Sequence, residues 1–259
     1  MAAETEVGSV ASSTPMRSLE RALDVLEVLQ RSGEPMRLSD VARAAGLTPA
    51  TTSRILGVLA SRGYVASEGK SHRLGPAVLA AAHGFLVADV LTRAANPVLQ
   101  ELAATTSLTV SLYERVGFER VLVARVDGAE PLRYQLPVGR RLPLHLGAGK
   151  ALAVDMDDDE LAALAEHVRE LGEDAPVDLA ALRADLADLR EPGFHVSVGE
   201  RAVGVVAASV PVRDPDGRLI AALSAAGPVE KHSRDEVLAQ ADEVRRAAAA
   251  IGRSVPRAR

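Results

Sequence analysis

The sequence predicts an α+β protein of two domains, a helical N-terminal unit that ends in a β-hairpin and a C-terminal unit built on an antiparallel sheet with flanking helices. Two observations carry this prediction. Apolar residues recur at helical spacing over most of residues 18–62, and two short strand patterns follow directly. Farther along, strand patterns flank helical ones between residues 109 and 225. A chain of 259 residues is long enough for two such domains.

The first domain is expected to hold three helices. The first begins at Ser18 as its N-cap, turns Leu19, Ala22, Leu23, Leu26 and Leu29 inward, and ends near Ser32. A short second helix is capped by Ser39, and Gly46 breaks it. The third spans residues 49–62, with Thr48 as N-cap and Pro49 at the first helical position.

Two short helices joined by a tight glycine turn form the pattern of a helix-turn-helix, whose second helix enters the major groove N-terminus first. The start of the 49–62 helix is small and hydrogen-bonding, with a cation farther on, as contact with base edges and phosphates requires. An ordinary helical hairpin with a polar outer face is the alternative. The predicted contacts are Thr48, Ala50, Thr51, Ser53 and Arg54.

A β-hairpin over residues 63–75, with its turn at 67–70, weakens that alternative. A hairpin directly after the recognition helix is the wing of a winged helix-turn-helix, here spanning residues 17–76. Lys70, His72 and Arg73 are expected to meet phosphates or the minor groove. For His72, a surface residue that makes no DNA contact is an equally good interpretation.

Composition and charge narrow the class of protein. Cysteine is absent, which excludes disulfides and thiolate chemistry, and no apolar run reaches the length of a membrane span. Residues 1–16 are small and polar without a signal pattern, so we expect a disordered leader on a cytoplasmic protein. Residues 17–75 carry a net +3 in a chain of net −5. This excess is common by chance, but it fits phosphate contact, with Arg17 and Arg21 among the contacts.

The second domain is expected to alternate helices and strands. Residues 77–106 read as mostly helical with a break near Asn96-Pro97, residues 77–93 serve as a linker helix, and residues 94–255 form the domain proper. The predicted helices are 161–171 and 179–189, and the predicted strands are 109–114, 120–126, 132–136, 194–198, 203–212 and 219–225. The segment 214–217 is a hairpin-type turn.

A glycine loop precedes a helix expected from Lys150 onward. Gly147, Ala148 and Gly149 expose backbone N–H groups at the positive end of that helix, an arrangement that suits a carboxylate. The loop lacks the residues of a nucleoside-triphosphate or dinucleotide motif, because leucines and an alanine stand at 144, 151 and 152. A glycine-rich helix start that binds nothing is the alternative.

Several motifs in order resemble the IclR family of bacterial transcriptional regulators, over residues 17–252. They are SLERALDVLE at 18–27, GLTPATTSRIL at 46–56, GY at 63–64, HRLGP at 72–76, VGRRLPLHLGAGKA at 138–151, SVGE at 197–200, PVRD at 211–214 and ALSAAGP at 222–228. The resemblance implies a regulator that binds double-stranded operator DNA under control of a small-molecule effector, typically an organic or aromatic acid. It also implies a homodimer or dimer of dimers and a GAF-like or profilin-like C-terminal sheet.

The resemblance further implies an effector pocket lined by Ser197, Glu200 and Ser224, with Leu132 and Leu142 as its apolar wall and His145 beside the glycine loop. A serine on a sheet is also commonly satisfied by backbone, which is the alternative for Ser224. Between His145 and Gly149 this chain has three residues where many relatives have four. Ala207 and Ala226 stand where relatives often carry polar groups, which implies a comparatively apolar pocket.

An enzyme and a protein-interaction module are the competing classes. Histidines, serines and aspartates allow a catalytic triad to be drawn, but no G-x-S-x-G pattern is present. The histidines at 83, 145, 167, 195 and 232 lack the spacing of zinc ligands. The sequence therefore predicts no catalytic residue, metal ligand or cofactor and no membrane partner, and it favours a DNA-binding regulator.

Overall fold

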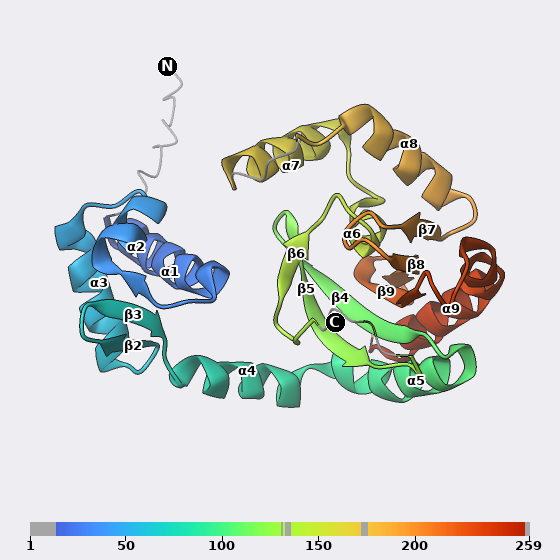
Figure 1. Cartoon of the computed structure of the whole chain (residues 1–259), viewed down its shortest axis with the longest axis horizontal. Helices are drawn as coiled ribbons and strands as arrows, with labels where there is room; N and C mark the ends of the chain where they lie inside the picture. Colours follow the sequence, from blue (N-terminus) through green and yellow to red (C-terminus); the bar gives the residue numbers. More distant parts are fainter. Residues whose placement is uncertain (1–13, 131, 133–135, 172–175, 257–259) are drawn as a thin grey trace, which may run out of the picture. The chain divides into compact units, whose positions relative to one another are not determined.

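The computed structural model describes residues 14–130, 132, 136–171 and 176–256. The chain divides into two compact units, Met1–Ala88 and Asp89–Arg259, drawn in blue to teal and in green to red in Figure 1. Both units combine helices with antiparallel sheet. The predicted α+β class is therefore confirmed.

A small sheet and three helices precede the last helix of the first unit: α1 (Thr14–Ser32), α2 (Leu38–Ala44) and α3 (Pro49–Ser61). Their apolar faces meet in a core of Val25, Leu29, Val41, Leu56 and Val65. Each element supplies only one or two of these side chains. The two short helices α2 and α3 depend on this mutual packing for stability, because isolated helices of their length are marginal in water.

Helix α1 differs from its prediction at its start and in its buried face. It begins at Thr14, so Ser18 lies inside the helix and is not its N-cap. Val25 and Leu29 are buried, whereas Leu19 and Leu23 are 59% and 52% exposed. The two ridges lie about a third of a turn apart on the helix, and only the one that faces α2 and α3 is covered within this unit.

The turn between α2 and α3 follows the predicted chemistry, apart from the first cap. The N-cap of α2 is Arg37, without a side-chain cap, so the expectation that Ser39 caps this helix is wrong. The chain enters α2 directly from the short strand β1 (Met36–Arg37), which leaves no room for a separate cap. Gly46 ends the turn with a φ of +63°. Thr48 caps α3 as predicted, its Oγ1 accepting from the N–H of Thr51 at 3.3 Å.

The predicted hairpin is present as β2 (Val65–Glu68) and β3 (Ser71–Leu74), joined at Gly69-Lys70. Strand β1 pairs with β3 and completes a three-stranded sheet of order β1-β3-β2. This strand was not predicted, because two residues are too few to show an alternating pattern.

Helices α4 (Ala77–Ala88) and α5 (Val90–Thr106) are separated at Asp89 rather than near Asn96-Pro97 as predicted. The Asp89 carboxylate accepts from the N–H of Thr92 at 2.7 Å and caps α5. Pro97 lies inside α5, because the packing of this helix against the second unit's sheet outweighs one missing helix bond. No single described helix is long and apolar enough to span a membrane, and α4 and α5 meet that criterion only as a broken pair.

The second unit is built on a six-stranded antiparallel sheet of order β6-β5-β4-β9-β8-β7. The strands are β4 (Thr109–Val116), β5 (Glu119–Val126), β6 (Arg141–Pro143), β7 (His195–Val198), β8 (Val205–Arg213) and β9 (Leu219–Pro228). Five of them match predicted strands within a few residues, and β6 was not predicted. Most of the predicted strand 132–136 lies outside the described residues.

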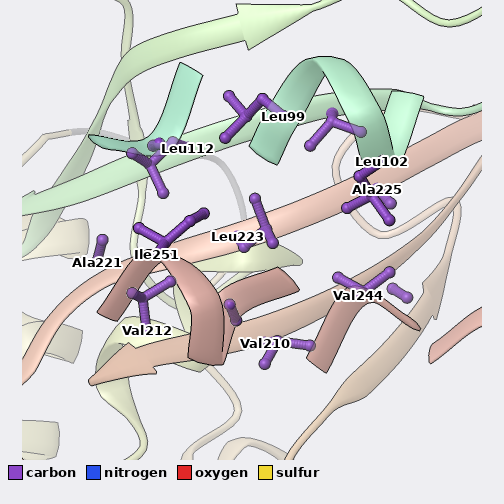
Figure 2. Close-up of a cluster of buried hydrophobic side chains, with 14 of the residues drawn as sticks. Leu99, Leu102, Leu112, Val210, Val212, Ala221, Leu223, Ala225, Val244 and Ile251 are labelled. Atoms are coloured by element: carbon purple, nitrogen blue, oxygen red, sulfur yellow. The ribbon is translucent and has the colours of Figure 1, made fainter. Parts of the chain in front are cut away.

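One face of this sheet is covered by α5 and α9 (Arg234–Ser254). Figure 2 shows the contact: Leu99 and Leu102 of α5 and Val244 and Ile251 of α9 lie against Leu223 of β9. Helix α9 was not predicted, although its buried residues Val237, Ala241, Val244, Ala248 and Ile251 recur at helical spacing.

The opposite face carries α6 (Ala148–Ala153), α7 (Asp158–Glu170) and α8 (Leu179–Arg190) around a second apolar core. The last two match the predicted helices. Helix α6 begins at Ala148, two residues before the predicted start at Lys150. Small side chains on α6 let it lie close to the sheet, and a cavity opens beside its first turn.

Candidate functional site

The outer surface of α3 presents the residues that the sequence proposes for base contacts. Ala50, Ser53 and Arg54 are exposed, and Thr51 is half-buried. The opposite side of the helix is anchored by the buried Thr52 and Leu56. The Thr48 and Thr51 hydroxyls are hydrogen-bonded to each other at 3.0 Å, so the first turn is fixed. The helix therefore offers a rigid end of small and polar side chains followed by one cation.

The wing presents one exposed cation and two side chains engaged within the hairpin. Lys70 is exposed in the turn. Arg73 pairs with Glu68 on the adjacent strand at 3.1 Å, and His72 Nδ1 lies 2.9 Å from the Ser67 hydroxyl. Arg17 and Arg21 are both exposed on α1. These side chains lie within one unit, on three different elements.

A small polar cavity of about 50 Å³ lies on the α6 face of the second unit's sheet and opens to solvent. Its floor consists of small residues on three neighbouring strands. Ser111 of β4 is paired with Ser224 of β9, and Ala226 of β9 with Ala207 of β8. Because directly opposed residues share a face of the sheet, these four side chains point the same way. The cavity suits a small molecule.

Six of the nine predicted effector contacts line this cavity: Leu132, Gly147, Ala148, Ser197, Glu200 and Ser224. The other three do not. Leu142 is buried in the apolar core beneath α6. Gly149 faces inward, where an added Cβ would collide with the Leu144 carbonyl. His145 is half-buried beside the loop, and burial lowers its pKa, with Arg120 and Lys150 adding to the effect.

The glycine loop already has a carboxylate bound to it. The N–H of Gly147 donates to Glu200 Oε2 at 2.9 Å. Gly147 has φ +52° and ψ −127°, a conformation that only glycine adopts without strain. The sequence proposed this loop amide for a ligand's carboxylate, but in the structure the protein's own side chain occupies it.

Glu200 also binds two further groups. Lys150, 5% exposed, places its Nζ 2.7 Å from Glu200 Oε2 and 2.7 Å from Asp185 Oδ2. His195 Nε2 lies 3.0 Å from Glu200 Oε1, and because an ionised carboxylate only accepts, that nitrogen carries the proton. Burial opposes ionisation of Glu200, but hydrogen bonds from His195, Lys150 and Gly147 outweigh it and lower its pKa to about 2.

Arg120 is the most buried charged residue of the cavity wall, with 1% of its surface exposed. Its Nη1 donates to the Leu146 carbonyl, and its guanidinium lies 5.1 Å from the centre of the Tyr113 ring. Burial lowers its pKa to about 10, which leaves it charged at neutral pH. Arg125, at the same wall, is paired with Asp127 at 2.7 Å.

The cavity lining combines small apolar side chains with charged and polar ones. Ala207 and Ala226 line the cavity as the resemblance implied, and three arginines and three serines line it as well. Ser224 accepts a hydrogen bond from the buried Ser209 at 3.1 Å, a side-chain partner rather than the backbone partner that was considered. The sequence interpretation missed Arg120 and Arg125. Their signal was present, since two arginines bracket the apolar run 121–124 of a strand.

Comparison with known proteins gives the same two-part organisation. Residues 18–69 match the family model described as the IclR helix-turn-helix domain. Residues 84–253 match the one described as bacterial transcriptional regulator IclR C-terminal. The HTH-type transcriptional repressor AllR of Salmonella paratyphi A is 30% identical over 234 residues, which cover 88% of this chain and 86% of the repressor.

Solved structures share the fold. The IclR family transcriptional regulator of Brucella abortus matches with a TM-score of 0.81 at 22% identity, over 96% of this chain and 97% of that one. An IclR homolog of Microbacterium hydrocarbonoxydans, solved in complex with 4-hydroxybenzoate, matches with a TM-score of 0.68 at 23% identity, over 92% and 98%. With a helix-turn-helix in one unit, an antiparallel sheet in the other and both family models matched, the chain belongs to the IclR family of bacterial transcriptional regulators.

Proposed function

We propose that this regulator binds a specific operator as a homodimer or dimer of dimers in the cytoplasm, and that a small organic or aromatic acid in the second unit's cavity controls its operator affinity. One observation carries the proposal: the same chain holds an exposed, capped recognition helix and a separate polar cavity. The AllR repressor and the 4-hydroxybenzoate complex of the Microbacterium homolog support it.

The DNA contacts fall into two groups. Ala50, Thr51, Ser53 and Arg54 at the exposed start of α3 are proposed to reach base edges, and the Thr48 cap holds that start in place. Phosphate contacts position the protein and carry no sequence information of their own. They are proposed for the exposed Arg17, Arg21, Lys70 and Arg73 and for the half-buried His72.

Dimerisation is proposed from uncovered apolar side chains on the first unit. Helix α4 buries none of its residues, and Leu79 on it is 74% exposed. Leu19 and Leu23 on α1 are also exposed. A second copy of the chain would cover such a surface. It would also place two recognition helices about 34 Å apart, one turn of DNA, so that the operator is read in two half-sites.

The proposal is tested by measuring the affinity of the protein for the DNA upstream of its own gene and for a random duplex at equal salt. Specific binding is expected to be tighter by about a thousandfold or more. Arg54→Ala should weaken it by about tenfold or more and leave the fold intact, because one base or phosphate contact is lost. Arg253→Ala removes an exposed arginine of α9 and serves as the matched control.

Equal affinity for both duplexes would exclude specific operator binding as the function. An enzymatic or a protein-interaction function would then remain. A titration of the operator complex with small acids then separates the two halves of the proposal. If operator binding is specific but no acid alters it, the DNA assignment stands and effector control is wrong.

A further inference from the structure

The loop amide that would hold a ligand's carboxylate is already occupied. Glu200 takes the N–H of Gly147, and Lys150 and His195 also bind its two oxygens. A second carboxylate at this position would meet the ionised Glu200 at close range and would have to break three contacts. An anionic ligand in the cavity therefore needs another cationic group.

Arg120 has the unused hydrogen-bonding capacity that such a ligand requires. A guanidinium carries five N–H donors, and among the described residues Arg120 uses one, from Nη1 to the Leu146 carbonyl. Its Nε is buried without a partner. No described carboxylate lies within ion-pair distance of it, and Glu200 acts on it only at longer range. A buried cation left this way is costly unless an anion completes it.

The guanidinium is also aimed at the cavity. A Cβ placed on Gly147 would lie 3.9 Å from Arg120 Nη2 and 3.9 Å from the Ser197 hydroxyl, and Gly147 and Ser197 both line the cavity. The Tyr113 ring and the Leu146 carbonyl also contact the group. Arg125 also has a buried Nη2, but its charge is balanced by Asp127 at 2.7 Å, whereas no described carboxylate pairs with Arg120.

We propose that Arg120 is the anion-recognition residue of the cavity, and that it binds the carboxylate of a small monocarboxylic acid. This inference rests on the proposed effector-binding function and names the group that selects the ligand. The restriction to one carboxylate follows from Glu200, whose charge at the same cavity repels a second. Ser111 and Ser224 on the floor can hydrogen-bond the neutral part of the ligand.

Formate tests this in the wild-type chain, because it is small enough to enter a cavity of any shape. The probe is the ¹H–¹⁵N signal of Arg120 Nε, assigned by its loss in Arg120→Lys. As formate is added, the chemical shift of this signal should change and reach saturation, whereas the other arginine Nε signals should stay in place. The references are chloride at equal ionic strength and the neutral analogue formamide, neither of which should move the signal. No saturable movement up to about 0.1 M formate, where surface charges are screened, would overturn the proposal.

Larger probes and variants extend the test. Acetate and benzoate should bind more tightly than acetamide and benzamide, and calorimetry should show about tenfold or greater weakening in Arg120→Met, because a charge-assisted pair is lost. Arg120→Lys keeps the charge and should retain part of the binding. Arg213→Gln removes an arginine that pairs with Asp155 outside the cavity lining; it is the matched control and should change the binding little. An acid preference that survives in Arg120→Met contradicts the proposal.

The outcome is distinguishable from that of the proposed function. If formate moves Arg120 Nε but no acid alters operator affinity, the anion site stands and effector control is wrong. If an acid releases the operator while Arg120→Met responds as the wild type does, effector control stands and this assignment is wrong.

Discussion

At the scale of single residues, the charged cluster around Glu200 determines how the cavity is closed on one side. Lys150 is buried with two carboxylates, Glu200 and Asp185, within 2.7 Å. Glu200 joins this cluster to the backbone of the glycine loop. The loop conformation and the ion pairs are therefore coupled, and changing the charge of Glu200 affects both.

Glu200→Gln should reduce the pH dependence of stability. Because the folded-state pKa of about 2 lies below the ordinary value of 4.5, ionised Glu200 stabilises the fold above about pH 4.5, and this contribution is lost as the pH falls toward 2. In urea titrations from about pH 6 to pH 3, the unfolding free energy of the variant should fall less steeply than that of the wild type. Parallel curves would contradict the assigned pKa.

Gly147→Ala should destabilise the second unit by about 1–3 kcal/mol, because φ +52° with ψ −127° strains any residue with a Cβ. We also expect the variant to lose its response to small acids, measured by operator release. Gly217→Ala, at φ +83° in the turn after β8, is the control. It should lower thermal stability and leave the response intact. An unaltered response in Gly147→Ala would remove the loop from the mechanism.

At the scale of elements, α3 depends on its first turn. The Thr48 hydroxyl bonds both the N–H and the hydroxyl of Thr51. Thr48→Ala should cost about 1 kcal/mol of unfolding free energy and weaken operator binding by misplacing the residues that follow. Thr48→Ser keeps the cap and should restore both. If Thr48→Ser binds operator as poorly as Thr48→Ala does, the threonine methyl group, rather than the cap, accounts for the loss.

The elements that the sequence predicted correctly carry strong local signals. Thr48-Pro49 and Gly46 specify the turn before α3, and the alternating strands of the second unit are visible without tertiary information. The break at Asp89 was misplaced because Pro97 is the stronger local signal, although packing overrides it. The buried face of α1 was misjudged because both of its apolar ridges satisfy helical periodicity.

At the scale of the whole molecule, we predict that the exposed apolar side chains of α4 contribute to a dimer contact. Leu79→Glu should raise the dimer dissociation constant by about tenfold or more, because a carboxylate would be placed in an apolar contact. Sedimentation velocity measures this directly, and operator affinity should fall with it. Val203→Glu changes a side chain that is 98% exposed in the other unit and should affect neither. Dissociation in Val203→Glu alone would place the contact elsewhere.

The cavity shows where whole-molecule information was needed. Six predicted residues reach it, because their motifs lie on strand ends and loops that the fold brings together. The two arginines that bracket residues 121–124 mark the segment, but the contact of Arg120 with the Leu146 carbonyl, 26 residues away, is visible only in the folded chain. The role of Glu200 was likewise hidden, because its contact with Gly147 joins positions 53 apart.

The packing of Tyr113 against Arg120 gives the protein an intrinsic spectroscopic signal for occupancy of the cavity. The chain has no tryptophan and only three tyrosines, so few chromophores contribute to its near-ultraviolet spectrum. The Tyr113 ring lies 5.1 Å from the guanidinium and lines the cavity. A molecule that enters there changes the surroundings of one of these few rings. Circular dichroism or tyrosine absorbance near 280 nm can therefore report occupancy without a dye, label or mutation.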